Sequence, residues 1–377
     1  MVALARKTLI REWPRFFPAI MAIGFAGLLL FAQAALVMGI FGSAAVYIHD
    51  SAGDLWVGYP GTQSVNLGRS INNDLEILLR SSPAIAQVEP MLWLDSDWRA
   101  AHGQGGVSIS VIGINDQSRG LLFQKLLLPA VRAALLQPAG VIVDRADLDQ
   151  LGVRLGDMAW IDKHPVRVVA TVSGLRSLGG VNVITSLSTA RWLADNPSES
   201  HRSTYFVARL HHPEQVQEAM DMLKGHPSFG PYAIWSAQDF SRRSQLFWLF
   251  DTGAGVAVGF LAIIVFLVGA IISSQALMAV IIASSREYAT LNALGAGMRA
   301  LRWLVLEQAL WIGGLGLTLG GSLSLILLPI ASTHDVPVAM NLPIALSCAA
   351  LVLLLSVISG LFAMRGLMRA EPALLLR

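Results

Sequence analysis

Residues 271–307 read IISSQALMAVIIASSREYATLNALGAGMRALRWLVLE. The stretch begins in an uncharged apolar run, leaves it at Ser285, and enters another apolar run after Arg302. Between the two runs, Glu287 lies near the start of a short segment and Gly295 just past its end, a pattern typical of a short helix. Such a helix, lying between two membrane spans on their basic side, is well placed to contact a soluble partner. A plain connecting loop is the alternative interpretation of this spacing.

The same stretch resembles the FtsX/MacB-type ABC transporter permease family. That family carries an RE-x-A-x-L-x-A-x-G-A segment and a Glu early in the next span, and this chain has residues 286–296 followed by Glu307. The ending, residues 364–377, resembles the family's Arg-rich close in P-A-x-x-L-R. The Tyr-Ala-Thr-Leu wording at 288–291 is closest to the Dev-type permeases of heterocyst glycolipid exporters. Asn292 occupies the position where many members of the family carry Lys or Arg.

The resemblance implies that the polar segment couples the chain to an ATPase. Glu307 is an ionisable residue at a membrane position and therefore a functional candidate. The alternatives are that its side chain extends to the interface or pairs with Arg299 or Arg302. A Gly-x-x-x-Gly pattern permits close helix contact. The expected coupling residues are Ser285, Arg286, Glu287, Tyr288, Leu291, Ala293, Leu294, Gly295 and Ala296, and the expected helix-packing glycines are Gly255, Gly259, Gly316 and Gly320.

The composition is that of a membrane protein. The 377 residues are 54% hydrophobic and only 14% charged, where soluble domains carry about a quarter charged residues, and the mean hydropathy is +0.58. The net charge of +2 comes without a basic patch, so no nucleic-acid partner is expected. The single cysteine, Cys348, excludes an intrachain disulfide and a cysteine-based metal site.

Four long apolar runs predict four membrane spans, each long enough for the ~20 residues that a bilayer requires. Ala32-Gln-Ala34 also resembles a signal-peptide cleavage site, but the apolar run continues to Tyr47, which favours a retained span. The expected segments are an amphipathic cytoplasmic helix at 1–15, a first span at 16–45, a periplasmic domain at 46–243, a stalk and second span at 244–284, a cytoplasmic coupling helix at 285–300, a third span at 301–328, a short periplasmic loop at 329–341, a fourth span at 342–364 and a cytoplasmic tail at 365–377.

The distribution of Lys and Arg sets the orientation. Basic residues flank the first span at its start, lie between spans two and three, and follow span four, whereas the connection at 329–341 has none. Both termini are therefore expected in the cytoplasm of a bacterial inner-membrane protein, with the large domain outside.

The segment from Asp50 to about Arg243 predicts a large α+β extracytoplasmic domain. Short apolar runs at 107–114, 166–172 and 205–210 predict strands. Residues 72–80 and 213–224 predict helices, and a strand at 232–235 would complete a βαβ-like unit with 205–210. Residues 236–250 are expected to continue the second span outward as a stalk. The family resemblance implies two lobes, one inserted into the other.

Catalytic motifs are absent from the sequence. None of the four lysines follows a glycine, so a Gly-Lys-Ser/Thr phosphate loop is missing and any ATPase must be another chain. No H-E-x-x-H or G-x-S-x-G sequence occurs, and no cofactor or metal is expected. Asp144, Asp147 and Asp149 are interpreted as a solvated helix start rather than a cation site.

The expected function is that of a non-catalytic permease subunit of an ABC export system, in which ATP hydrolysis moves the periplasmic domain. The expected partners are a separate ABC ATPase, a second permease copy or a similar permease, membrane lipid, and, by the Dev-type resemblance, a periplasmic adaptor and an outer-membrane channel. Two alternatives stay open: a transmitter that activates a periplasmic cell-wall enzyme, and a lipoprotein-releasing permease.

Overall fold

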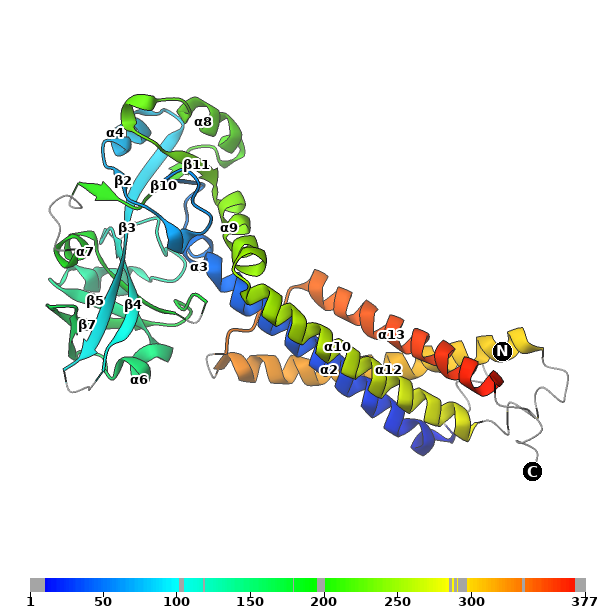
Figure 1. Cartoon of the computed structure of the whole chain (residues 1–377). Helices are drawn as coiled ribbons and strands as arrows, with labels where there is room; N and C mark the ends of the chain where they lie inside the picture. The colour runs from blue at the N-terminus through cyan, green and yellow to red at the C-terminus, as the bar shows by residue number, and fades with distance from the viewer. Residues whose placement is uncertain are drawn as a thin grey trace. The chain divides into compact units, whose positions relative to one another are not determined.

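The computed structural model describes residues 11–101, 105–117, 119–178, 180–194, 201–284, 287, 290, 297–333 and 336–369. The chain divides into two compact units. We call residues 40–255 the sheet unit, and residues 1–39 with 256–377 the helical unit (Figure 1). The predicted amphipathic helix at 1–15 lies largely outside the described residues.

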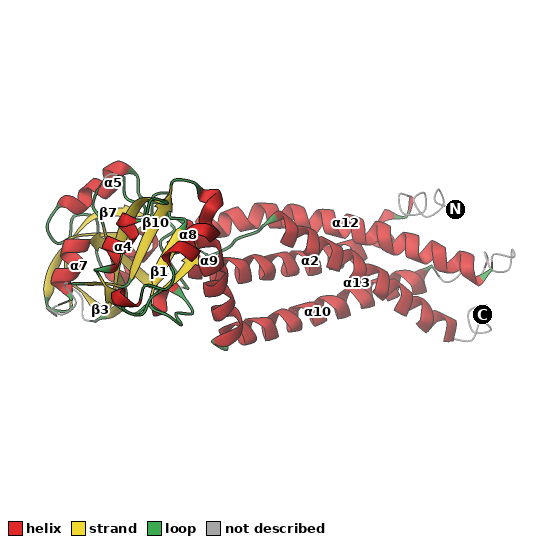
Figure 2. Ribbon diagram, turned by 90° about the horizontal axis from the view of Figure 1, so that it is seen from above, coloured by secondary structure: helices red, strands yellow, loops and turns green. Residues whose placement is uncertain are grey.

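Long apolar helices make up the helical unit and run alongside one another (Figures 1 and 2). Many of their large apolar side chains are exposed, which is typical of helices that face membrane lipid. Within the described residues, four helices are long and apolar enough to cross a membrane. They are α2 (Trp13–Gly42), α10 (Ala254–Ala283), α12 (Met298–Thr333) and α13 (Leu342–Arg369).

A small apolar core joins all four helices. Phe16 and Ile23 of α2, Leu277 of α10, Ile312 of α12 and Val352 of α13 are buried together. The connection after α12 is also attached to α2, because the Ala339 amide donates to the Ala35 carbonyl at 3.0 Å. This core fixes the four helices as one bundle.

The sheet unit is built on a nine-stranded sheet within the described part of the chain, with a separate pair of short strands, β2 and β9. The strand order is β11-β1-β10-β3-β4-β8-β5-β7-β6, and the neighbours β4–β8 and β5–β7 are parallel. The strands are β1 (Leu55–Gly58), β2 (Ile71–Asn72), β3 (Ile85–Ala100), β4 (Val107–Ile114), β5 (Gly140–Asp144), β6 (Met158–Ile161), β7 (His164–Val172), β8 (Val181–Ser186), β9 (Arg202–Ser203), β10 (Tyr205–Leu210) and β11 (Ala233–Ser236).

Strand β3 belongs to both halves of this sheet. Its first half pairs with β10 from Ile85 to Met91, and its second half pairs with β4 from Leu92 to Trp98. Its last residues, 98–100, pair with β6 at the far end of the strand order, which closes β3-β4-β8-β5-β7-β6 into a ring. The other half of the sheet, which we call the open half, consists of β11, β1, β10 and the first part of β3. The remaining strands of the ring, β4 to β8, all lie in sequence between β3 and β10. The ring is therefore an insertion into the open half.

Three apolar cores follow from this arrangement. One fills the ring with small β-branched residues such as Val111, Val143 and Val183. A second lies between the open half of the sheet and its covering helices α4 (Leu75–Ser81) and α8 (Val216–Leu223), which Figure 1 shows together. The third, around Trp56 and Phe240, packs the short helices near the ends of the spans against the sheet. The remaining short helices are α3 (Val46–His49), α5 (Pro129–Ala133), α6 (Leu148–Leu151), α7 (Leu187–Leu193) and α9 (Ala237–Leu246).

The predicted fold class is confirmed: apolar spanning helices accompany a large domain of strands and helices. The strands predicted at 107–114 and 205–210 match β4 and β10. The predicted βαβ-like unit exists with one change. Strand β1 pairs with both β10 and β11 and therefore lies between them.

The prediction of a stalk at 236–250 is wrong. Helix α9 does not continue α10, because Gly253 takes a left-handed conformation (φ 75°) between them. Phe240 of α9 is fully buried and stacks on Trp235 at 4.7 Å. The Trp248 indole N–H donates to Ser64 Oγ at 3.0 Å. These contacts place residues 237–251 in the sheet unit.

Candidate functional site

A polar cluster around Arg15 lies at the end of the helical unit where α2 begins and α10 ends; we call this the basic end. One guanidinium nitrogen of Arg15, Nη1, donates to Glu287 Oε1 at 2.7 Å and to Glu12 Oε2 at 2.8 Å. The other, Nη2, donates to Ser284 Oγ at 2.8 Å. The Ser284 hydroxyl is buried and donates in turn to the Val280 carbonyl. Arg15 therefore attaches the start of α2 both to the end of α10 and to the segment that follows it.

Of the nine predicted coupling residues, the structure describes only Glu287. Its carboxylate is the partner of Arg15, and it is about half exposed, at 46%. The other eight, namely Ser285, Arg286, Tyr288, Leu291, Ala293, Leu294, Gly295 and Ala296, lie outside the described residues. Their coupling role stays a prediction. Sequence reasoning did not identify Arg15 as a partner of Glu287, although their opposite charges at the borders of two apolar runs were the available signal.

Glu307 of α12 lines an apolar groove with a cavity volume of about 700 Å³. Its carboxylate oxygen Oε1 is buried and has no hydrogen-bond partner among the described residues. Arg299 and Arg302 are exposed, and no ion pair to Glu307 is found in the part of the chain that the structure describes. The groove is lined by Trp303, Leu304, Leu306, Glu307, Leu310, Trp311 and Gly314 of α12 and by Leu353 of α13.

Gly316 and Gly320 lie where α12 crosses α2. A Cβ on Gly320 would overlap the carbonyl oxygen of Gly24, and a Cβ on Gly316 would lie 2.8 Å from a methyl group of Ile23. Since neither helix can move away without opening the core, only glycine fits here. We call Gly24, Gly316 and Gly320 the glycine seam. Backbone contact of this kind is typical of tightly packed membrane helices.

Gly255 and Gly259 behave differently, and a helix contact through this pair is not found within the described chain. A Cβ on Gly255 would overlap the carbonyl of Leu249, so this glycine accommodates the break between α9 and α10. Gly259 has no described atom within 4 Å of where its Cβ would lie. The left-handed Gly253 brings Leu249 back against the first turn of α10, which explains the difference.

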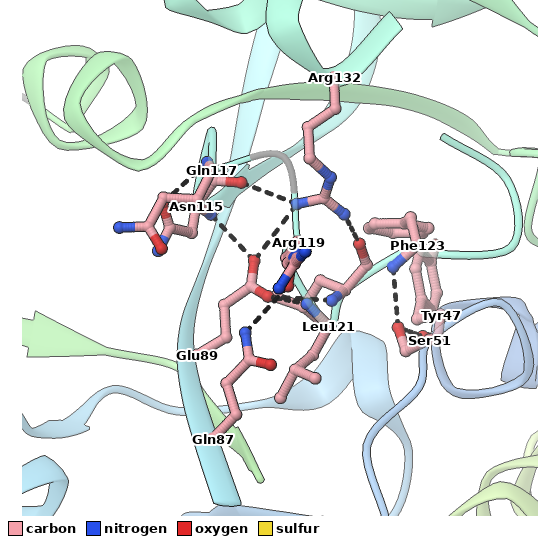
Figure 3. Close-up of polar contacts among 11 residues, drawn as sticks. Tyr47, Ser51, Gln87, Glu89, Asn115, Gln117, Arg119, Leu121, Phe123 and Arg132 are labelled. Carbon is pink, nitrogen blue, oxygen red and sulfur yellow. Dashed lines mark hydrogen bonds and ion pairs between the residues drawn. The ribbon is translucent and has the colours of Figure 1, made fainter. Parts of the chain in front are cut away.

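The sheet unit contains a buried ion pair, shown in Figure 3. The Glu89 carboxylate on β3 lies 3.6 Å from Arg132 Nη1 on α5, and both side chains are at most 2% exposed. The carboxylate also accepts from the backbone N–H groups of Asn115, Leu121 and Leu122. Arg132 donates to the carbonyls of Asn115 and Leu122. A Cβ on Gly120 would overlap Arg132, so the described part of the loop, residues 115–117 and 119–123, closes tightly around the pair.

This arrangement fixes the loop rather than providing a reactive group. Burial raises the pKa of Glu89, and the neighbouring Arg132 and the three backbone N–H groups oppose that shift. Burial likewise lowers the pKa of Arg132, opposed by Glu89. Because four donors surround the carboxylate, little of its acceptor capacity remains for a substrate or metal. Within the described residues, no group of three His, Cys, Asp or Glu side chains is arranged to hold a metal ion.

The end of the loop around the Glu89–Arg132 pair also contacts residues 47–51, which follow the first span. The Phe123 amide donates to Ser51 Oγ at 3.0 Å, and the Ser51 hydroxyl donates to the Tyr47 carbonyl (Figure 3). The Lys125 ammonium donates to the His49 carbonyl at 2.5 Å. His49 Nε2 lies 3.0 Å from Ser241 Oγ of α9. Helix α3 is thus tied both to the ring and to α9 within the sheet unit.

The acidic group at 144–149 begins a helix, as predicted, and Asp149 is exposed, but the prediction of solvation is wrong for the other two carboxylates. Asp144 and Asp147 are buried. Asp144 accepts from the amides of Ala146 and Leu175, and the Asp147 carboxylate pairs with Arg176 Nε at 2.5 Å. The turn at 173–178 covers this helix start, which the local sequence did not indicate.

Comparison with known families gives one match. Residues 259–372 match the family described as FtsX-like permease C-terminal. The match begins inside α10 and covers α12 and α13. Together with the four apolar helices, it describes a multi-pass membrane protein with an FtsX-like permease region.

Solved structures similar to about half of this chain are also found. The periplasmic region of MacB from Actinobacillus actinomycetemcomitans is 15% identical, covers 52% of this chain and 94% of its own, and has a TM-score of 0.39. The extracellular domain of the noncanonic ABC-type transporter YknZ from Gram-positive bacteria is 14% identical, with coverages of 48% and 98% and a TM-score of 0.35. A domain of a protein described as a permease from Porphyromonas gingivalis is 13% identical, with coverages of 50% and 90% and a TM-score of 0.34. No curated protein matches this sequence.

Proposed function

We propose that this chain is the non-catalytic permease subunit of an ABC export system, of which the ATPase is a separate chain. The match of residues 259–372 to an FtsX-like permease region carries the proposal. The placement of a large sheet unit between the first and second apolar helices supports it. In this proposal the membrane is the bacterial inner membrane, the basic end is cytoplasmic, and the sheet unit is periplasmic.

The ATPase docks at residues 285–296, a segment that includes Glu287. Arg15 donates hydrogen bonds to both Glu287 and Ser284, so a displacement of this segment would move α2 as well as α10. In this role Glu287 is a positioning residue whose carboxylate is held by the chain itself.

Movement would then pass along α2 and α10, the two helices that connect the helical unit to the sheet unit along the chain. The glycine seam holds α12 against α2 through their backbones, which leaves little freedom for the two helices to slide. ATP-driven closure would therefore move the bundle as a body and shift the sheet unit. Work would be done on a substrate outside the membrane.

The partners in this proposal are the ATPase, a second copy or a similar permease, and membrane lipid. The likeness of residues 288–291 to Dev-type permeases adds a periplasmic adaptor and an outer-membrane channel.

Co-purification of the tagged full-length chain in mild detergent, with mass spectrometry of every associated chain, tests the proposal. A stoichiometric ATPase with an adaptor supports export. An ATPase with a cell-wall hydrolase would replace export by signal transmission, and an ATPase with lipoprotein cargo would indicate lipoprotein release. Recovery of the folded chain without any ATPase would contradict the permease assignment.

A further inference from the structure

The groove beside Glu307 combines an apolar surface with one buried carboxylate oxygen that has no hydrogen-bond partner among the residues that the structure describes. Its cavity volume of about 700 Å³ is in the range of pockets that hold drug-sized molecules, about 300–1,000 Å³. The lining is apolar apart from the Glu307 side chain, and it includes the two indoles of Trp303 and Trp311. A buried carboxylate oxygen without a donor is costly, so a ligand that supplies a cationic donor would be favoured here.

The position of Glu307 along α12 determines the shape of such a ligand. The third apolar span begins at Arg302, and Glu307 lies five residues further along, about 7–8 Å at 1.5 Å per residue. Helical side chains lean toward the N-terminus of their helix, so the carboxylate points toward the membrane surface. Leu310, Trp311 and Gly314 follow it and therefore line the deeper part of the groove.

This order selects against a phospholipid. In a phospholipid, the phosphate lies between the acyl chains and the amine. With its chains in the deeper groove, the phosphate would approach Glu307 first, and the two negative charges would repel. A molecule whose ammonium is attached directly to its apolar body has no such conflict. Its ammonium would meet the carboxylate, and the aromatic faces of the two tryptophans would favour a cation nearby.

We infer that the groove between α12 and α13 is a binding site for an amphipathic amine, with Glu307 as the residue that recognises the ammonium. The apolar body of the ligand occupies the groove toward Gly314 and Leu353. The inference does not depend on the proposed export function, because it concerns binding alone.

Two glycines of α12 provide a matched pair of variants. Gly314 lines the groove and has no described atom within 4 Å of a Cβ, so Gly314→Leu fills the groove without a clash in the bundle. Gly321 is equally open and lies outside the groove, so Gly321→Leu is the control for folding and for the loss of a helical glycine. Glu307→Gln removes the charge at nearly constant size, and Glu307→Asp keeps it.

The experiment uses the full-length chain in nanodiscs of phosphatidylcholine and a long-chain primary amine that carries an aliphatic diazirine. After irradiation, labelled peptides are identified by mass spectrometry. We expect saturable labelling of the 303–314 region that dodecylamine competes away and dodecanol does not. Labelling should fall about tenfold or more in Glu307→Gln, because the amide oxygen of Gln still accepts a hydrogen bond but lacks the charge that strengthens the bond to an ammonium. It should also fall in Gly314→Leu and persist in Glu307→Asp and Gly321→Leu.

Three results would overturn the inference. Equal competition by dodecanol would mean that the groove takes any apolar chain. Competition by phosphatidylethanolamine would mean that a lipid headgroup occupies it. Unchanged labelling in Gly314→Leu, with the variant folded, would place the amine elsewhere.

Discussion

Arg15 and Glu287 lie 272 positions apart in the sequence, yet the Arg15 guanidinium donates to the Glu287 carboxylate at 2.7 Å. The contact joins the first residues of α2 to the segment between α10 and α12. Both side chains are partly exposed, so the pair contributes little to the stability of the fold, about 0–1 kcal/mol. Its effect should appear in coupling instead.

Charge reversal at this pair is therefore the first prediction. Arg15→Glu and Glu287→Arg should each lower the ATPase activity of the assembled complex severalfold, whereas membrane insertion and thermal stability stay close to wild type. The double variant should recover much of the lost activity, because the attraction is restored with the charges exchanged. ATPase assays of the four proteins as a double-mutant cycle measure the coupling. Additive losses would show that the two residues act separately.

A second prediction concerns the glycine seam. Gly320→Ala places a methyl group against the Gly24 carbonyl and should destabilise the bundle by about 1–3 kcal/mol, as overpacking usually does. Gly321→Ala, one residue further along α12, meets only open space and should be neutral or stabilising by up to about 1 kcal/mol. Thermal unfolding of both variants in the same detergent makes the comparison. Equal stabilities would mean that α2 and α12 do not touch at this point.

The third prediction concerns how the stability of the loop around the buried Glu89–Arg132 pair depends on pH. Because burial raises the pKa of Glu89, folding takes up a proton there. The stability from this group is fully present below the ordinary pKa of Glu, about 4.3, and is lost as the pH rises through the raised value. Glu89→Gln does not titrate. The opening free energy of the loop at 115–123, measured by hydrogen exchange, should thus decline with pH in wild type relative to the variant. Parallel pH profiles would contradict the assigned burial.

A fourth prediction compares two ion pairs of similar length. Asp147 is fully buried beside Arg176 at 2.5 Å, whereas Glu76 and Arg80 lie 2.7 Å apart on an exposed helix face. Arg176→Met leaves a buried carboxylate without this cation and should cost about 3–5 kcal/mol. Arg80→Met should cost less than about 1 kcal/mol. Unfolding of the two variants under identical conditions checks the difference, and similar losses would argue against the burial of Asp147.

Much of the fold could be predicted because local patterns determine it. Apolar runs predict spans, and the short runs rich in β-branched and aromatic residues at β4 and β10 predict strands. Strand β3 was missed because Pro90 and several acidic residues interrupt its pattern, while its pairing with three other strands stabilises it. Contacts between distant positions, such as Glu89 with Arg132 and Gly24 with Gly320, cannot be predicted from the local sequence pattern. The same holds for the burial of Asp147, which a turn about 30 residues away covers.

The central claim is that a separate ATPase contacts this chain at residues 285–296. A photo-crosslinking amino acid placed at Leu291 in the full-length chain tests it directly, with the same group at Pro337, in the connection after α12, as control. Leu291 should crosslink to an ATP-binding subunit, and Pro337 should not. Crosslinking of the ATPase from both positions, or from neither in the folded and assembled complex, would contradict it.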